Sequence, residues 1–331
     1  MKNNISVLLA AMMMASCLSA CGLQDAPKAS AGSKLQIVTT IFPEYDWVMN
    51  VLGDKASEAE VTMLLDNGVD LHSYQPTVDD ILKISTCDLF IYVGGESDEW
   101  VEDALKESTN KDMYVIDLLD VLGDNVKEEE VVEGMQEEEE EAHEHEDGEN
   151  EETEYDEHVW LSLQNAARLT AKISDVLQTI DTKNAQSYKA NAQNYISKLN
   201  ELDRQYQDAV SSAARKTLLF GDRFPFRYLV DDYGLSYYAA FVGCSAETEA
   251  SFETISFLAA KADALSLDCV MTIEGSDHRI AETIVQSTAA RDQKILTMDS
   301  MQSTTSRDVQ SGATYLGIME ENLDVLSEAL N

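Results

Sequence analysis

Positive charge is scarce in this sequence. Its 331 residues include 23 Lys and Arg against 62 Asp and Glu, and the formal net charge is −39 at pH 7. The imbalance is not confined to one segment, because 44 acidic and 22 basic residues remain when residues 127–157 are set aside. Nucleic-acid binding depends on Lys and Arg that neutralise phosphates. The composition therefore excludes a nucleic-acid partner and favours a cation.

Cysteine is also scarce, and the usual catalytic motifs are missing. Two of the five cysteines lie within the first 21 residues, which leaves Cys87, Cys244 and Cys269 without any CxxC spacing. This odd number argues against a disulfide framework or a thiolate zinc cage, and we interpret Cys244 as a buried structural residue. There is no HExxH motif, and Gly94-Gly95 lacks the lysine of a phosphate loop. A metallohydrolase is therefore the weaker hypothesis, and no catalytic residue is predicted.

The N-terminus has the pattern of an export signal. An apolar core at residues 5–15 is followed by the sequence LSAC at 18–21, and this core is too short to span a bilayer as a mature helix. Small residues directly before a cysteine are typical of a lipoprotein signal. We therefore predict a signal peptide at 1–20, acylation of Cys21 and a small, polar tether at 21–34. An ordinary cleaved signal is the alternative.

Short apolar or β-branched runs alternate with helical patterns along the rest of the chain, which is typical of parallel α/β sheets. We predict an α/β fold with two lobes, each a roughly four-stranded and mostly parallel sheet flanked by helices. The expected strands are 36–40, 61–65, 89–93 and 113–117 in the first lobe and 217–220, 237–241, 269–273 and 295–298 in the second.

One long helix is expected between the lobes, at 184–211, with the N-terminal lobe at 35–183 and the C-terminal lobe at 212–331. Its larger side chains recur in steps of three and four, which places them on one face. These are Tyr188, Ala192, Tyr195, Leu199, Leu202, Tyr206 and Val210. At 1.5 Å per residue the helix is roughly 40 Å long, and such a rigid connection would limit hinge opening.

The segment 128–157 is the most unusual part of the chain. It contains 18 acidic residues, no Lys or Arg, and the histidines His143 and His145. We predict a disordered acidic loop, spanning 127–157, that captures cations weakly through these imidazoles and raises their local concentration. The alternative is a solvated spacer, since glutamate-rich runs are often only that.

Four loop positions could together bind a divalent ion. His72, Asp222 and Asp299 each follow a predicted strand, and His158 ends the acidic loop. Ligands of open α/β sheets bind at the carboxyl ends of the strands. Two imidazoles and two carboxylates, half from each lobe, would suit a hard-to-borderline divalent metal. Any one of them alone would be weak evidence.

Several motifs resemble the zinc/manganese ABC-transporter solute-binding lipoprotein family, over about residues 35–330. They are TTIFPEYDW at 39–47, HSYQP beginning at His72, EHVWL around His158 and LTMDS around Asp299. The resemblance implies that these two histidines and Asp299 bind metal. The acidic, histidine-bearing insertion is similar to that of zinc-type members.

The sequence departs from the family at the third ligand, a His or Glu just after the first strand of the C-terminal lobe. Gly221 stands there, and Asp222 is the nearest replacement. Glu274, a histidine of the acidic loop, or a water molecule could also complete the site. Carboxylate ligands shift preference towards manganese or iron. Zinc remains the leading metal, with manganese or iron as the alternative.

The resulting hypothesis is an extracytoplasmic, lipid-anchored receptor on the cell membrane. It would capture a divalent metal between its lobes, as a monomer and without catalysis, and the resemblance implies delivery to an ABC permease. A metal-binding surface adhesin is an alternative, because it would carry the same anchor and the same site.

Overall fold

The computed structural model describes residues 34–136, 154–245 and 249–331, and one compact unit spans Leu35–Asn331. Cys21, His143 and His145, which carry the predictions of lipidation and of cation capture by the loop, lie outside the described residues. Within the described part of the chain, no helix has the length and apolar character needed to span a membrane.

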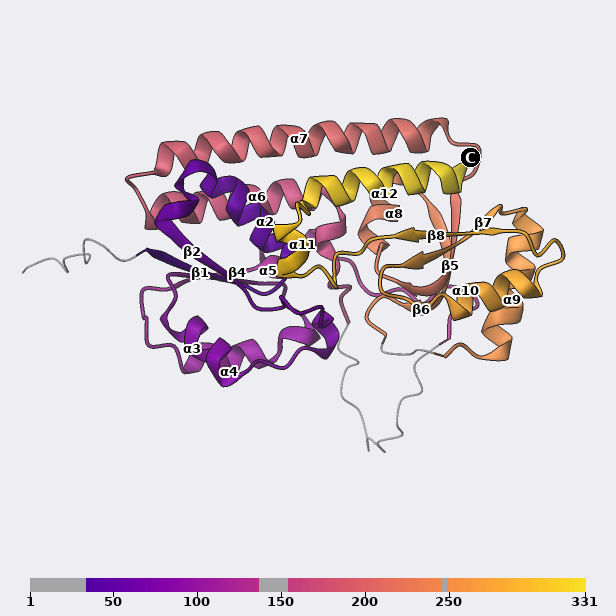
Figure 1. Cartoon of the computed structure of the whole chain (residues 1–331), viewed down its shortest axis with the longest axis horizontal. Helices are drawn as coiled ribbons and strands as arrows, with labels where there is room; N and C mark the ends of the chain where they lie inside the picture. Colours follow the sequence, from indigo (N-terminus) through magenta and orange to yellow (C-terminus); the bar gives the residue numbers. More distant parts are fainter. Residues whose placement is uncertain (1–33, 137–153, 246–248) are drawn as a thin grey trace, which may run out of the picture. The chain divides into compact units, whose positions relative to one another are not determined.

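Two four-stranded parallel sheets form the framework, in the orders β2-β1-β3-β4 and β6-β5-β7-β8 (Figure 1). The first contains β1 (Leu35–Thr39), β2 (Ala59–Met63), β3 (Leu89–Tyr92) and β4 (Tyr114–Asp117). The second contains β5 (Thr217–Phe224), β6 (Ser236–Val242), β7 (Cys269–Ile273) and β8 (Lys294–Met298). The predicted α/β class with two parallel four-stranded sheets is confirmed.

Helices cover both sheets. In the first half they are α2 (Phe42–Leu52), α3 (Val78–Thr86), α4 (Trp100–Lys106), α5 (Leu118–Leu122) and α6 (Leu163–Ile180). In the second half they are α8 (Arg227–Tyr233), α9 (Phe252–Leu265), α10 (Arg279–Ser287), α11 (Ser306–Gln310) and α12 (Tyr315–Leu330). Helices α2 and α6 lie on one side of the first sheet, and α3 and α4 lie on the other (Figure 1).

Helix α7 (Ala185–Ser212) is the predicted long helix, and it packs against α2 and α6 of the first half and against α8 and α12 of the second (Figure 1). Its seven buried residues are the stripe expected from the sequence: Tyr188, Ala192, Tyr195, Leu199, Leu202, Tyr206 and Val210. One hydrophobic core continues through both halves beneath it, and a smaller second core lies in the second half.

Strand β5 is longer than predicted, and this changes the position of Asp222. The strand continues through Phe224, and its register against β6 shifts between Phe220 and Arg223. Asp222 therefore lies within the irregular part of the strand, not in a loop after it. A Cβ at Gly221 would lie 2.6 Å from the Cα of Ala281 in α10, so glycine is needed there for helix packing.

Candidate metal centre

His72 lies in a short 3-10 turn (Leu71–Ser73) that follows β2. Asp70 caps this turn by accepting a hydrogen bond from the His72 backbone N–H at 3.0 Å. On the ring, Nδ1 lies 2.8 Å from Ser97 Oγ and 3.3 Å from Glu157 Oε2. Because these partners hold Nδ1, the other ring nitrogen, Nε2, remains to face a ligand.

His158 is fully buried just before a second 3-10 turn (Val159–Leu161). Its Nδ1 lies 3.0 Å from Asp156 Oδ1, and the same oxygen accepts a hydrogen bond from the His158 backbone N–H at 2.9 Å. A carboxylate partner at Nδ1 sets the orientation and tautomer of a metal-binding imidazole. His158 is therefore held in the same manner as His72.

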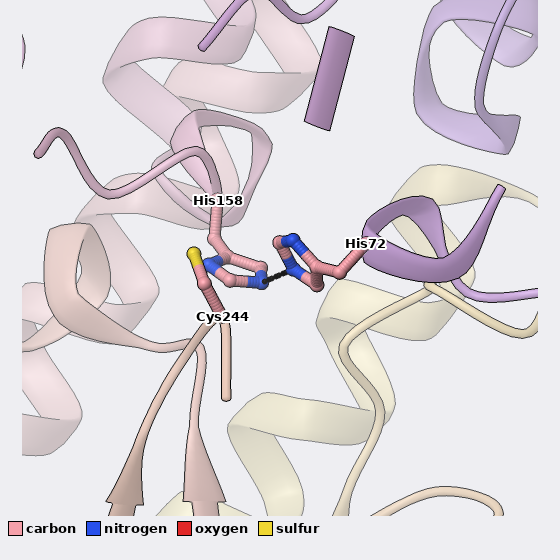
Figure 2. A group of neighbouring side chains, drawn as sticks. All are labelled: His72, His158 and Cys244. Atoms are coloured by element: carbon pink, nitrogen blue, oxygen red, sulfur yellow. Dashed lines mark hydrogen bonds between the residues drawn. The ribbon is translucent and has the colours of Figure 1, made fainter. Parts of the chain in front are cut away.

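The Nε2 atoms of the two rings face each other. Nε2 of His72 lies 3.2 Å from Nε2 of His158 (Figure 2). Two nitrogens bound to one tetrahedral zinc ion at 2.0–2.1 Å are about 3.3 Å apart. The pair thus already has the spacing that a shared ion requires, although 86 positions separate the two residues in the sequence.

Cys244 lies beside this pair, which the sequence analysis did not anticipate. Its sulfur and one nitrogen of each ring all lie within 4.8 Å of one another (Figure 2). Cys244 is partly buried, and burial followed by nearby carboxylates raises the pKa of its thiol. The interpretation of Cys244 as a purely structural core residue missed this position, because a single cysteine has no motif spacing.

An acidic cavity of about 230 Å³ opens next to His72. It is lined by His72, Glu96, Ser97, Glu129, Glu154, Tyr155, Glu157 and Cys244. Burial, and then the neighbouring carboxylates, raise the pKa of Glu96. Four carboxylates around one cavity produce a negative potential that attracts cations towards the histidines.

Comparison with known proteins places the chain in a family. Residues 37–329 match the model of the family described as zinc-uptake complex component A, periplasmic. The chain belongs to this family. Its proteins are metal-binding components of transport systems, and it is not a family of enzymes.

Named relatives of this zinc-uptake family agree with the assignment. The zinc-binding lipoprotein AdcA of Streptococcus pneumoniae is 31% identical over 98% of the chain, and the chain spans 60% of that protein's length. The zinc-uptake protein ZnuA of Bacillus subtilis is 29% identical, with 95% of this chain and 93% of that protein covered. The crystal structure of the Zn(II)-bound ZnuA-like domain of S. pneumoniae AdcA is 26% identical, with a TM-score of 0.68, and the match covers 90% of this chain and 99% of that one.

Asp222 and Asp299 lie outside the three-residue group that the described residues form. Asp222 accepts hydrogen bonds from its neighbour Arg223 N at 3.0 Å and from Ile273 N at 3.3 Å. Asp299 Oδ1 accepts from Met301 N at 2.7 Å. In this arrangement backbone N–H groups occupy both carboxylates, and their role as ligands stays a prediction.

Glu274, the auxiliary candidate, organises the loop that carries Asp299. Its carboxylate accepts hydrogen bonds from Ser300 N at 2.7 Å, Ser300 Oγ at 2.8 Å and Gln302 N at 3.1 Å. Burial, and then the charge of Asp299, raise the pKa of Glu274 to about 7. These contacts indicate that Glu274 positions the loop after β8.

Arg223 is a second residue that the sequence analysis missed. Its guanidinium pairs with Asp70, the residue that caps the turn of His72. Although burial alone would raise the pKa of Asp70, the charge of Arg223 keeps it below the ordinary value. The pair joins β5 of the second half to the histidine loop of the first.

Proposed function

We propose that this chain is an extracytoplasmic zinc-binding lipoprotein that captures zinc at His72 and His158 and delivers it to an ABC permease. The observation that carries this proposal is the Nε2–Nε2 distance of 3.2 Å. Both rings hold their Nδ1 atoms against carboxylates, an arrangement suited to binding a metal ion through Nε2.

Zinc is the proposed cargo because imidazole is a borderline ligand that suits it well. Relatives named as zinc-binding or zinc-uptake proteins support this choice. Asp299, at the carboxyl end of β8, stays a predicted further ligand, and so does Asp222. A site completed by such carboxylates would move the preference towards manganese or iron, which is the alternative cargo.

The proposed attachment to the membrane depends on residues that lie outside the described part of the chain. We propose acylation at Cys21 and a tether that holds the folded part, a monomer, near a permease. The acidic loop with His143 and His145 would recruit cations to the cavity beside His72. Glu129 N donates to Glu154 O at 3.0 Å and Asp156 N donates to Lys127 O at 2.9 Å, so the two ends of the loop are held together next to the site.

The test is isothermal titration of metal-free protein with zinc, comparing His72→Ala, His158→Ala and the double variant with the wild type. We expect each single variant to bind zinc far more weakly and the double variant to lose the site. His278→Ala is the matched control, since His278 is held by Thr272 at 3.0 Å and belongs to no cluster of metal-ligating residues in the described chain. Wild-type affinity in the double variant would overturn the proposal.

Growth of a deletion strain tests delivery. Loss of growth that appears only under zinc limitation and is restored by the wild-type gene supports transport. Normal growth with loss of surface attachment would instead favour the adhesin alternative.

A further inference from the structure

Cys244 differs from the other described cysteines. All three described cysteines are free thiols, but Cys87 and Cys269 are buried away from the histidines. Cys87 contacts Ile84 and Met113, and Cys269 contacts Met271 and Ala329. Only Cys244, among the described residues, forms a close group with two potential metal ligands.

The chain segment before Cys244 is shaped to approach His158. A Cβ at Gly243 would lie 3.0 Å from His158 Cε1, 3.1 Å from its Nδ1 and 2.9 Å from Phe224 O. Only a residue without a side chain leaves room there. Cys244 N then donates to Glu129 Oε1 at 3.3 Å, which fixes the cysteine at the end of β6. Glycine and this hydrogen bond together hold the thiol next to the imidazole pair (Figure 2).

We propose that the Cys244 thiolate is the third ligand of the metal ion bound by His72 and His158. This inference rests on the proposed function of the site and specifies its ligand set. A tetrahedral zinc ion with Zn–N of 2.0–2.1 Å and Zn–S of 2.3 Å places sulfur and nitrogen about 3.6 Å apart. In the structure the Cys244 sulfur and one nitrogen of each ring all lie within 4.8 Å of one another, so the group would contract around the ion to reach that spacing.

Binding would exchange a proton for the metal. The S–H bond of Cys244 breaks, a Zn–S bond forms and the proton passes to solvent water, since only the thiolate is a good metal ligand. The acidic cavity that reaches both His72 and Cys244 provides a path from solvent to this point.

A thiolate ligand changes which metals the site accepts. Soft sulfur favours zinc and disfavours manganese, magnesium and calcium, which prefer oxygen ligands. A His₂Cys set would therefore favour zinc over these harder ions. The part of the chain that reaches the metal would then be the end of β6 and not the end of β5.

Cobalt substitution tests this ligand assignment. We expect the wild-type protein loaded with Co²⁺ to show thiolate-to-cobalt charge-transfer absorption in the near ultraviolet, and Cys244→Ser and Cys244→Ala to lose it. Both variants should also bind zinc more than about tenfold more weakly and lose part of the preference for zinc over manganese. Cys269→Ala is the matched control and should keep the absorption and the affinity.

Alkylation of the unmutated chain is an independent measurement, and its main readout does not depend on the folding of any variant. Peptide mass mapping should show that zinc protects Cys244 of the wild-type protein from iodoacetamide. The His72→Ala/His158→Ala variant, as a further comparison, should lose this protection. Wild-type zinc affinity and cobalt spectrum in Cys244→Ala would overturn the inference. If the double histidine variant still lost zinc in that case, the proposed function would stand and only the third ligand would be wrong.

Discussion

At the scale of single residues, the sequence Asp156-Glu157-His158 serves two imidazoles at once. Asp156 contacts Nδ1 of His158, two residues further along the chain. Glu157 contacts Nδ1 of the other histidine, His72. Although burial alone would raise the pKa of Glu157, its hydrogen bonds with His72 and Ser97 keep it lowered. One tripeptide therefore contains a proposed ligand and the carboxylates that contact Nδ1 of both rings.

Replacing Asp156 tests the value of this orientation. Asp156→Ala should weaken zinc binding by roughly ten- to a hundredfold, because outer partners of metal-binding histidines typically contribute that much. Titration calorimetry on metal-free protein measures it. Asp103→Ala, at an exposed carboxylate of α4, is the matched control and should bind as the wild type does. Equal affinity in both variants would contradict the orienting role of Asp156.

At the scale of elements, α2 packs against α7 around a buried carboxyl group. Asp46 of α2 accepts hydrogen bonds from Tyr195 OH of α7 at 2.9 Å and from Asn50 Nδ2 at 2.9 Å. Burial raises the pKa of Asp46 from 3.8 to about 6. The helix pair therefore favours the protonated acid, and ionisation opposes their packing.

This pKa predicts how stability depends on pH. Between 3.8 and about 6 the folded state holds more protons at Asp46 than the unfolded state does, so the free energy of unfolding falls as pH rises through that window. The shift corresponds to of order 3 kcal/mol. Asp46→Asn removes this ionisation, so the variant should gain stability relative to wild type from about pH 4 to about pH 7.

Urea unfolding of metal-free protein at several pH values measures the difference between the two proteins. Comparing wild type with variant cancels the other carboxylates, which titrate in both. A stability difference that stayed constant across this pH range would show that Asp46 is already ionised in the folded state.

At the scale of the whole described unit, α12 connects the second half to the metal-site loop of the first. Tyr315 OH donates to Trp160 O at 2.6 Å, and Trp160 Nε1 donates to Ser300 O at 2.8 Å. Tyr206 OH of α7 donates to Met319 O of α12 at 2.6 Å. Two long helices and these buried bonds tie the halves together beside His158, and we expect them to limit hinge opening.

Removing one of these bonds should loosen the loop. Tyr315→Phe keeps the ring but leaves the buried Trp160 carbonyl without that donor, which costs about 1–3 kcal/mol of unfolding free energy. Urea unfolding measures this cost, and hydrogen exchange should become faster in the turn Val159–Leu161. Tyr114→Phe, at a tyrosine that is 41% exposed in β4, should change neither quantity. Unaltered stability in Tyr315→Phe would contradict the connecting role of this bond.

The elements that local pattern controls were predictable. Parallel strands were visible as short apolar runs, and the stripe of α7 followed from its spacing of three and four. His72 and His158, whose role as ligands stays a prediction, were selected because each lies in a motif at a loop. Asp222 was misplaced because the end of β5 depends on how Gly221 packs against α10, and no local pattern reveals that contact.

The amino-acid order by itself determined the strands of the two sheets, the long helix, the loop motifs that contain the two histidines, and the acidic character that attracts cations. Each of these depends on residues within a few positions of one another. Only the tertiary structure decided that Cys244 lies beside the imidazole pair and that Arg223 pairs with Asp70. Cys244 lies 86 positions after His158 in the sequence, and Arg223 lies 153 positions after Asp70. The formation of these contacts depends on how the two sheets pack under α7 and α12, and that packing is a property of the whole chain.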